Sequence, residues 1–127
     1  MSLNIDNDGT ITMYQGDTGE VTINGLDGDK NYQVFFSVRD KNNNIVGEEL
    51  KVTSNGRESV SFFLSASLTN KFVVPRGSAS ETYFYGVKLC ELSDKLLEDT
   101  LFIAGKTYGE RNLLIVFPKV VEGPVNE

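Results

Sequence analysis

The sequence contains no histidine and no tryptophan, and it has one cysteine and three prolines in 127 residues. Without histidine, the chain cannot form a serine–histidine or cysteine–histidine nucleophile pair, and it lacks the commonest general base and metal ligand. The single cysteine, Cys90, excludes an intramolecular disulfide, which fits a reducing compartment or a protein made in a cytoplasm. These absences remove most of the common catalytic arrangements.

Positive charge is also scarce, because 12 basic residues stand against 18 acidic ones and give a net charge of −6. An acidic chain without a basic cluster repels phosphate backbones, so no nucleic acid is expected as a partner. No apolar run approaches the roughly 20 residues that a membrane-spanning helix needs. No signal peptide opens the sequence. We therefore expect a soluble protein with no membrane partner.

The length of 127 residues is typical of one domain, and a chain of this size can bury an ordinary core without a metal or a disulfide. We expect a single β-sandwich domain over residues 1–127. Within it, residues 1–9 are expected to be an N-terminal extension. Residues 121–127, which include Pro124, are expected to be a C-terminal tail or the start of a linker.

Alternation of apolar and more polar residues dominates the chain and predicts β-strands. The clearest case is residues 32–39, where every second side chain is apolar and large. Strands are predicted at residues 11–14, 21–23, 32–38, 45–54, 60–64, 83–89, 96–103 and 113–120, with a short helical turn at 65–70. The pattern favours an all-β fold, an antiparallel immunoglobulin-like β-sandwich of about eight strands. The cysteine pair and core tryptophan of antibody domains are absent, so the likeness is one of architecture.

Two short motifs invite a reading as ligand sites. Gly105-Lys106-Thr107 resembles the end of a phosphate-binding loop, but Thr100 stands where that motif needs its first glycine, and a strand is predicted to follow instead of a helix. No nucleotide or other cofactor is therefore predicted. Residues 4–9 match the opening of a calcium loop, although its twelfth position is Gln15 instead of glutamate. A turn is favoured there, and calcium binding through Asp6 and Asp8 stays open as the alternative.

The remaining carboxylates lie mainly in predicted turns or at outward positions such as Glu20, Asp40 and Glu58. A paired-carboxylate mechanism needs two acids held in one cleft. We predict no catalytic residue, and the protein is not expected to be an enzyme.

A second apolar face is the most informative feature of the predicted strands. If the alternating apolar sets face the core, the main strands also place an apolar residue on the opposite face, where a free-standing sandwich is normally polar. Contiguous apolar surface usually marks a partner site. The interface candidates are Phe35, Phe63, Phe84, Phe102, Leu114 and Val116. Two alternatives are that residues 65–72 cover part of this set, or that alternation fails where two phenylalanines are adjacent.

The order of segments resembles a family of phage proteins. Residues 11–19, Ile-Thr-Met-Tyr-Gln-Gly-Asp-Thr-Gly, are similar to the opening strand and turn of the N-terminal domain of baseplate upper proteins and related modules in phages and prophages of Gram-positive bacteria. Residues 83–89, Asp99-Thr100-Leu101 and residues 114–123 fit the same layout, so the resemblance covers about residues 10–123. It implies an immunoglobulin-like sandwich that anchors a larger receptor-binding or fibre protein to the tail. It implies no catalysis and no defined site residues.

Together these observations predict a non-catalytic structural or assembly module of a phage or prophage tail, at the baseplate or at a fibre attachment. The expected partners are other tail and baseplate proteins, or further copies of the chain in a trimer or hexamer. The expected location is the virion tail, after production in the bacterial cytoplasm. The alternative is a carbohydrate-binding module of a bacterial surface or secreted protein, with Tyr14 or Tyr108 stacking on a sugar.

Overall fold

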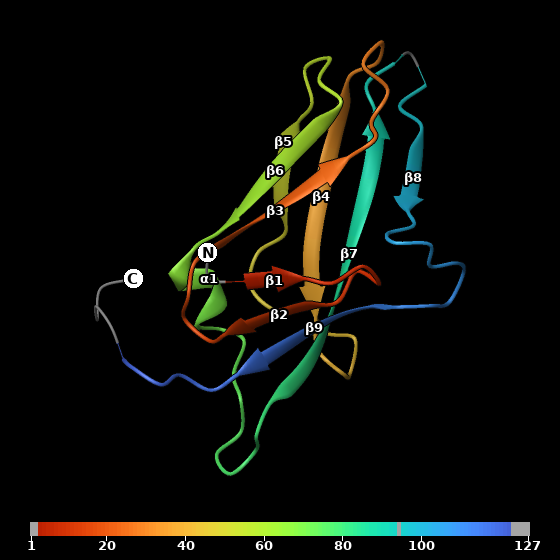
Figure 1. Ribbon diagram of the computed structural model, residues 1–127. Coiled ribbons are helices and arrows are strands. Elements are labelled where there is room, and N and C mark those ends of the chain that lie inside the picture. The colour runs from red at the N-terminus through yellow and green to blue at the C-terminus, as the bar shows by residue number, and fades with distance from the viewer. Residues whose placement is uncertain (1–2, 94, 123–127) are drawn as a thin grey trace.

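The computed structural model describes residues 3–93 and 95–122, which form nine strands and one short helix. Figure 1 shows that the strands lie in two layers. The elements are β1 (Leu3–Ile5), β2 (Ile11–Tyr14), β3 (Gly19–Asn24), β4 (Tyr32–Arg39), β5 (Leu50–Thr53), β6 (Ser59–Leu64), α1 (Ala66–Thr69), β7 (Glu81–Glu91), β8 (Glu98–Leu101) and β9 (Asn112–Phe117).

The two sheets differ in size. The larger sheet has the order β1-β2-β9-β7-β4-β5, with β8 also paired to β7, and the smaller sheet consists of β3 and β6. The pairing is antiparallel throughout, except that β2 runs parallel to β9. The predicted all-β sandwich is therefore confirmed, with nine strands in the described part of the chain where about eight were expected.

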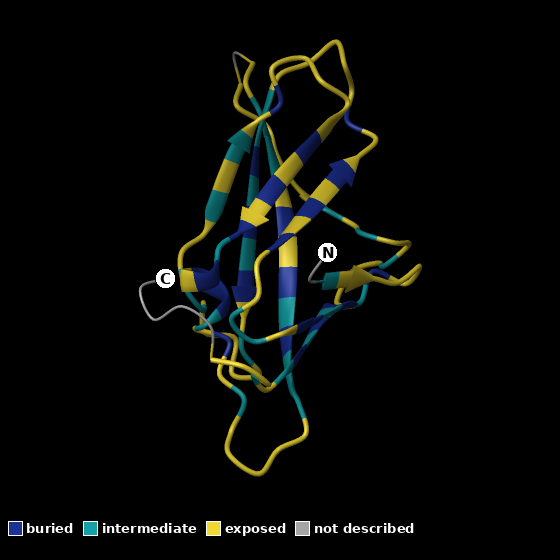
Figure 2. Cartoon of the chain, turned by 60° about the vertical axis from the view of Figure 1, so that its left-hand side comes forward, coloured by how far each residue is buried: buried dark blue, intermediate teal, exposed yellow. Residues whose placement is uncertain are grey.

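The core lies between the sheets and is built by the alternation that the sequence predicted. Every second residue of β3, β6 and the middle of β4 is buried, as the banding in Figure 2 shows. The Phe36 ring of β4 lies 5.4 Å from the Phe62 ring of β6 and 5.5 Å from the Tyr85 ring of β7. Burial of these apolar side chains is the main favourable term in folding.

The predicted helical turn is confirmed as α1, and it closes one end of the core. Ser65 caps the helix, because its hydroxyl accepts a hydrogen bond from the Leu68 backbone N–H at 3.2 Å. Leu68 and Phe72 are both buried in the core, and the Phe72 ring lies 5.6 Å from the Tyr83 ring. The segment 65–72 thus packs into the shared core and does not cover the outside of a sheet.

The N-terminal extension predicted at residues 1–9 is wrong for residues 3–5. These residues form β1, which pairs antiparallel with β2. The Leu3 side chain lies so close to Gly19 that a Cβ on residue 19 would clash with it. The strand is only three residues long, and the alternation of Leu3, Asn4 and Ile5 is too short to predict a strand from the sequence. Residues 1, 2 and 123–127, including most of the expected tail, lie outside the described residues.

One edge of β7 is shared by two strands, β8 and β9. The first half of β7 pairs with β9 up to Tyr85 and Asn112, and the second half pairs with β8 from Val87 and Leu101. Strands β8 and β9 therefore act as one strand that is interrupted opposite Gly86. Residues 102–111 leave the sheet between them, and we call this segment the excursion loop.

Tyr85 links the excursion region to the β1–β2 turn and should make stability sensitive to alkaline pH. Its hydroxyl donates a hydrogen bond to the Gly9 carbonyl, and burial raises the pKa of Tyr85 to about 12 from the usual 10.0. Between pH 10 and 12 the unfolded chain loses this proton before the folded chain does. The stabilising contribution is therefore complete below pH 10 and declines as pH rises towards 12.

We expect Tyr85→Phe to be less stable than the wild type at pH 7 by about 1 kcal/mol, because it lacks the hydrogen bond. Between pH 10 and 12 its denaturation midpoint should fall less steeply than that of the wild type. Urea unfolding over a pH series measures both effects. The control is Tyr14→Phe at an exposed position, which should leave the wild-type slope unchanged. Equal slopes for the wild type and Tyr85→Phe would contradict the expectation.

Candidate functional site on the outer face of the larger sheet

The outer face of the larger sheet, on the side away from β3 and β6, carries two of the predicted interface residues. Phe35 of β4 and Phe84 of β7 are half-buried there, in alternation with the core residues of the same strands. Phe35 is the cross-strand partner of Lys88, and Phe84 is that of Arg39. These two phenylalanines therefore lie on one face, as the sequence predicted.

Leu114 and Val116 do not lie on this face, and their prediction as interface residues is wrong. Both side chains are 0% exposed and belong to the core. The neighbouring Leu113, Ile115 and Phe117 point outward instead. A shift of one residue exchanges the two faces of a strand, and residues 113–117 are apolar at every position, so alternation could not fix the phase.

Phe63 and Phe102 complete the predicted set, but Phe63 lies apart from the others. It is 60% exposed on β6 of the smaller sheet, opposite Glu20, and so faces the other side of the sandwich. Phe102 is half-exposed just beyond the end of β8 and borders the same hollow as Phe84. The six candidates therefore do not form one surface.

A continuous apolar strip takes the place of the predicted patch on the outer face. Cross-strand pairs connect it, because Phe84 lies opposite Leu113 and Tyr14 lies opposite Phe117, and the rings of the second pair are 5.9 Å apart. Tyr14 is about half exposed, and the others are half-buried. We call this set the outer stripe: Tyr14, Phe84, Leu113, Ile115 and Phe117.

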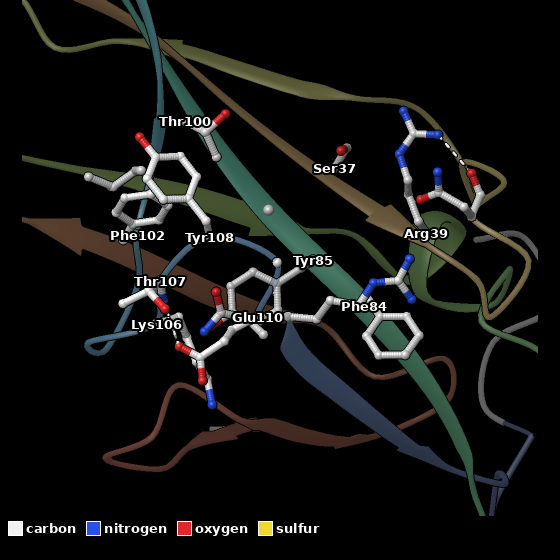
Figure 3. A pocket seen from close by; sticks show the side chains of 16 residues that line it. Ser37, Arg39, Phe84, Tyr85, Thr100, Phe102, Lys106, Thr107, Tyr108 and Glu110 are labelled. Atoms are coloured by element: carbon white, nitrogen blue, oxygen red, sulfur yellow. Dashed lines mark hydrogen bonds between the residues drawn. The ribbon is translucent and has the colours of Figure 1, made fainter.

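A cavity of about 360 Å³ lies beside the outer stripe, above Gly86. It exists because the excursion loop leaves the sheet at this point, so we call it the split-strand cavity. Strands β4 and β7, the end of β8 and the excursion loop all line it, as Figure 3 shows. An adjacent hollow of about 300 Å³ shares Ser37, Arg39, Gly86 and Thr100 with it and extends towards Phe35.

The excursion loop has a defined internal structure. Backbone hydrogen bonds from Lys106 to Ile103 and from Glu110 to Thr107 close two successive turns. The Glu110 carboxylate accepts hydrogen bonds from the Thr107 hydroxyl at 2.8 Å and from its backbone N–H at 2.7 Å, which lowers the pKa of Glu110. These contacts hold the loop that presents Tyr108, whose side chain is 90% exposed.

Two arginines lie on the opposite side of the cavity from Tyr108. The Arg111 guanidinium lies over the Phe84 ring at 4.2 Å from its centroid, and Arg39 donates a hydrogen bond to the Asn43 carbonyl at 2.9 Å. Among residues 3–93 and 95–122, neither arginine has a carboxylate oxygen within 4.0 Å. Both guanidinium groups can therefore still take an anionic partner.

Asp6 and Asp8, the residues of the calcium alternative, lie in the turn between β1 and β2. The Asp8 carboxylate accepts a hydrogen bond from the Thr10 backbone N–H at 3.0 Å, and the Asp6 carboxylate accepts one from the Asn4 amide at 2.9 Å. Within the described part of the chain, no group of three or more His, Cys, Asp or Glu side chains gathers as a metal site would require. Among the same residues, no helix is long and apolar enough to cross a membrane.

Comparison with known proteins adds information about the fold. No protein-family model matches the chain, and no curated protein sequence matches it. Among solved structures, the chain is similar to the crystal structure of the periplasmic chaperone SfaE, with a TM-score of 0.58 and 9% sequence identity over 91% of this chain. The match covers 56% of the chaperone chain. At this identity the likeness shows the fold alone, and it confirms the predicted immunoglobulin-like sandwich.

The corrected phase of β9 can be checked by stability measurements. Leu114→Ala should lower the free energy of unfolding by about 2–5 kcal/mol, because Leu114 is 0% exposed and its truncation leaves a cavity. Phe63→Ala should change it by less than about 0.5 kcal/mol, because that ring is 60% exposed. Urea denaturation of both variants measures the difference. If Leu114→Ala left the free energy of unfolding unchanged, Leu114 would have to lie at the surface, and this would contradict the structure.

Proposed function

We propose that the protein is a non-catalytic structural module of a phage or prophage tail that assembles through the outer face of its larger sheet. The observation that carries the proposal is the outer stripe, because the smaller sheet packs against the inner face only and leaves this apolar strip on the outside. Outer positions of an antiparallel sandwich are normally polar, and a contiguous apolar strip indicates a contact surface.

The composition of the outer stripe supports a protein partner. It contains three aromatic residues, Tyr14, Phe84 and Phe117, and Arg111 lies on one of them. Aromatic residues and arginine are enriched at the centres of protein interfaces. Their side chains already pack against cross-strand neighbours, so a partner would have to order them little on binding.

The resemblance to phage tail modules supports the same role. The Gly-Asp-Thr segment that carries it, residues 16–18, forms the connection from β2 to β3 in the structure. The Asp17 carbonyl accepts a hydrogen bond from the buried Thr69 hydroxyl at 2.8 Å, which ties this connection to α1. In this proposal the partners are other tail and baseplate proteins or further copies of the chain, and the domain works in the virion tail.

The carbohydrate-binding alternative has weaker support on this face. A sugar-stacking platform needs aromatic rings that present one flat surface. The Phe102 and Tyr108 rings meet at 79°, and the Tyr14 and Phe117 rings meet at 47°. Neither pair offers such a platform, so sugar stacking on either pair is not favoured.

Light scattering on a sizing column, over a concentration series, tests the proposed assembly. We expect a defined oligomer, such as a trimer or hexamer, that becomes monomeric in the double variant Phe35→Ser/Ile115→Thr. Both substitutions replace apolar side chains of the outer face by smaller polar ones and leave the core residues unchanged. Loss of about 2 kcal/mol or more at an interface centre raises the dissociation constant at least about thirtyfold.

The matched control is Phe63→Ser, which removes an exposed phenylalanine from the opposite side of the sandwich. It should leave the solution mass unchanged. Thermal melting of all three proteins verifies that the variants remain folded. The proposal would be contradicted by a wild-type protein that stays monomeric at every concentration and binds no other tail protein. The same holds if Phe63→Ser dissociates the oligomer and the outer-face variant does not.

A further inference from the structure

Gly86 occupies a position where neither the strand nor its packing requires glycine. It lies inside the eleven-residue strand β7, its backbone is not in the left-handed region, and a Cβ placed on it would meet no atom within 4 Å. Glycine weakens the interior of a strand, and such a glycine often marks the close approach of a ligand to the backbone. Gly86 is also the point opposite the strand interruption, at the floor of the split-strand cavity.

The walls on the two sides of Gly86 differ in chemistry. Figure 3 shows Phe102 and Tyr108 on one side of β7 and Ser37 and Arg39 on the other. The aromatic wall is fixed by the edge-to-face contact of its two rings, whose centroids are 5.0 Å apart. A ligand lying across the glycine would meet a single exposed aromatic face at one end and guanidinium groups at the other.

The charge at this cavity is opposite to that of the whole protein. The chain has a net charge of −6, yet two of its four arginines, Arg39 and Arg111, line this one cavity. Lys106 also lines it, but it lies near Asp8 and Glu110, and it adds to the hydrogen bonds that lower the pKa of both carboxyls. The two arginines are therefore the groups that would select an anion.

We propose that the split-strand cavity binds one saccharide unit that carries an anionic group. The Tyr108 ring contacts the C–H face of the sugar, Arg39 and Arg111 bind the carboxylate or phosphate, and the Ser37 and Thr100 hydroxyls meet the sugar hydroxyls. The volume of about 360 Å³ lies within the range of small-ligand pockets. A single aromatic face suffices here, because the anion provides the second anchor. The site is independent of the assembly proposed above, since it needs no partner protein.

Three probes with the same sugar ring separate the contributions. ¹H–¹⁵N NMR titrations of the wild-type protein with glucuronic acid, glucose 6-phosphate and glucose compare a carboxylate, a phosphate and a neutral group at one position. We expect saturable shifts of the Gly86 and Gly109 amide signals with at least one of the two anionic sugars. Glucose should bind at least about tenfold more weakly than that anionic sugar, because charged hydrogen bonds to arginine are lost. The tighter of the two anionic probes identifies the anion.

Gly86→Val is the decisive variant. A Cβ at residue 86 meets no atom within 4 Å, and valine suits a strand, so we expect the variant to be at least as stable as the wild type, with its side chain in the cavity floor. It should nevertheless lose detectable binding of the anionic sugar. Thermal melting and the same titration measure the two properties on one sample.

Two further variants test the two walls of the cavity separately, and each has a matched control variant elsewhere in the chain. Arg39→Gln should weaken the binding of anionic sugars about tenfold and leave the binding of glucose unaffected. Arg57→Gln, in an exposed turn between β5 and β6, should change the binding of neither. Tyr108→Ala should weaken all three sugars several-fold, whereas Tyr14→Ala, on the outer stripe, should weaken none. This pattern separates ligand contacts from general losses of charge or aromatic surface.

Several results would overturn the inference. These are the absence of saturable shifts for both anionic sugars at tens of millimolar, binding of glucose as tight as that of the anionic sugars, and unchanged sugar binding in Gly86→Val. If the wild-type protein binds none of the sugars and Gly86→Val changes the solution mass, the cavity belongs to the protein interface instead. That outcome would reject the saccharide site and leave the assembly proposal standing. Sugar binding by a protein that stays monomeric and binds no other tail protein would do the reverse.

Discussion

Strand β7 is the element on which the rest of the domain depends, because three other strands form their hydrogen bonds to it. Strand β4 runs along one of its edges, and β8 and β9 divide the other. Its inward residues, among them Tyr83 and Tyr85, fill the core. Its outward residues Phe84 and Gly86 support the outer stripe and the floor of the split-strand cavity. The same run of backbone therefore sets both stability and the shape of the candidate site.

The two parts of the candidate site meet at Phe84. This residue is a member of the outer stripe, and it also lines the split-strand cavity, where the guanidinium of Arg111 lies over its ring. The contact keeps Arg111 beside the apolar strip while its charge stays open to water. A protein partner on the stripe and a small ligand in the cavity would thus touch opposite sides of one arginine–aromatic pair.

The inward and outward faces of a strand can be predicted from the sequence where the outward positions are polar. In β6 the residues Ser59 and Ser61 alternate with buried ones, and the inward set followed directly. In β9 the residues from Leu113 to Phe117 are all apolar, so its inward and outward faces were exchanged. The pairing of β8 and β9 with one edge of β7 is a long-range property that no local pattern encodes, and the cavity was hidden for that reason. Gly86 is visible in the sequence as a glycine within a predicted strand, and together with the sugar-stacking candidate Tyr108 it is a local signal of the site.

The interrupted strand has a consequence for how this domain can diversify. Both ends of the excursion loop are anchored by separate ladders on β7, one through Leu101 and the other through Asn112. Changes in the length or composition of residues 102–111 would therefore leave the registers of both ladders in place. The sheet offers a natural grafting point, at which related chains could exchange one recognition loop for another while they keep the same scaffold.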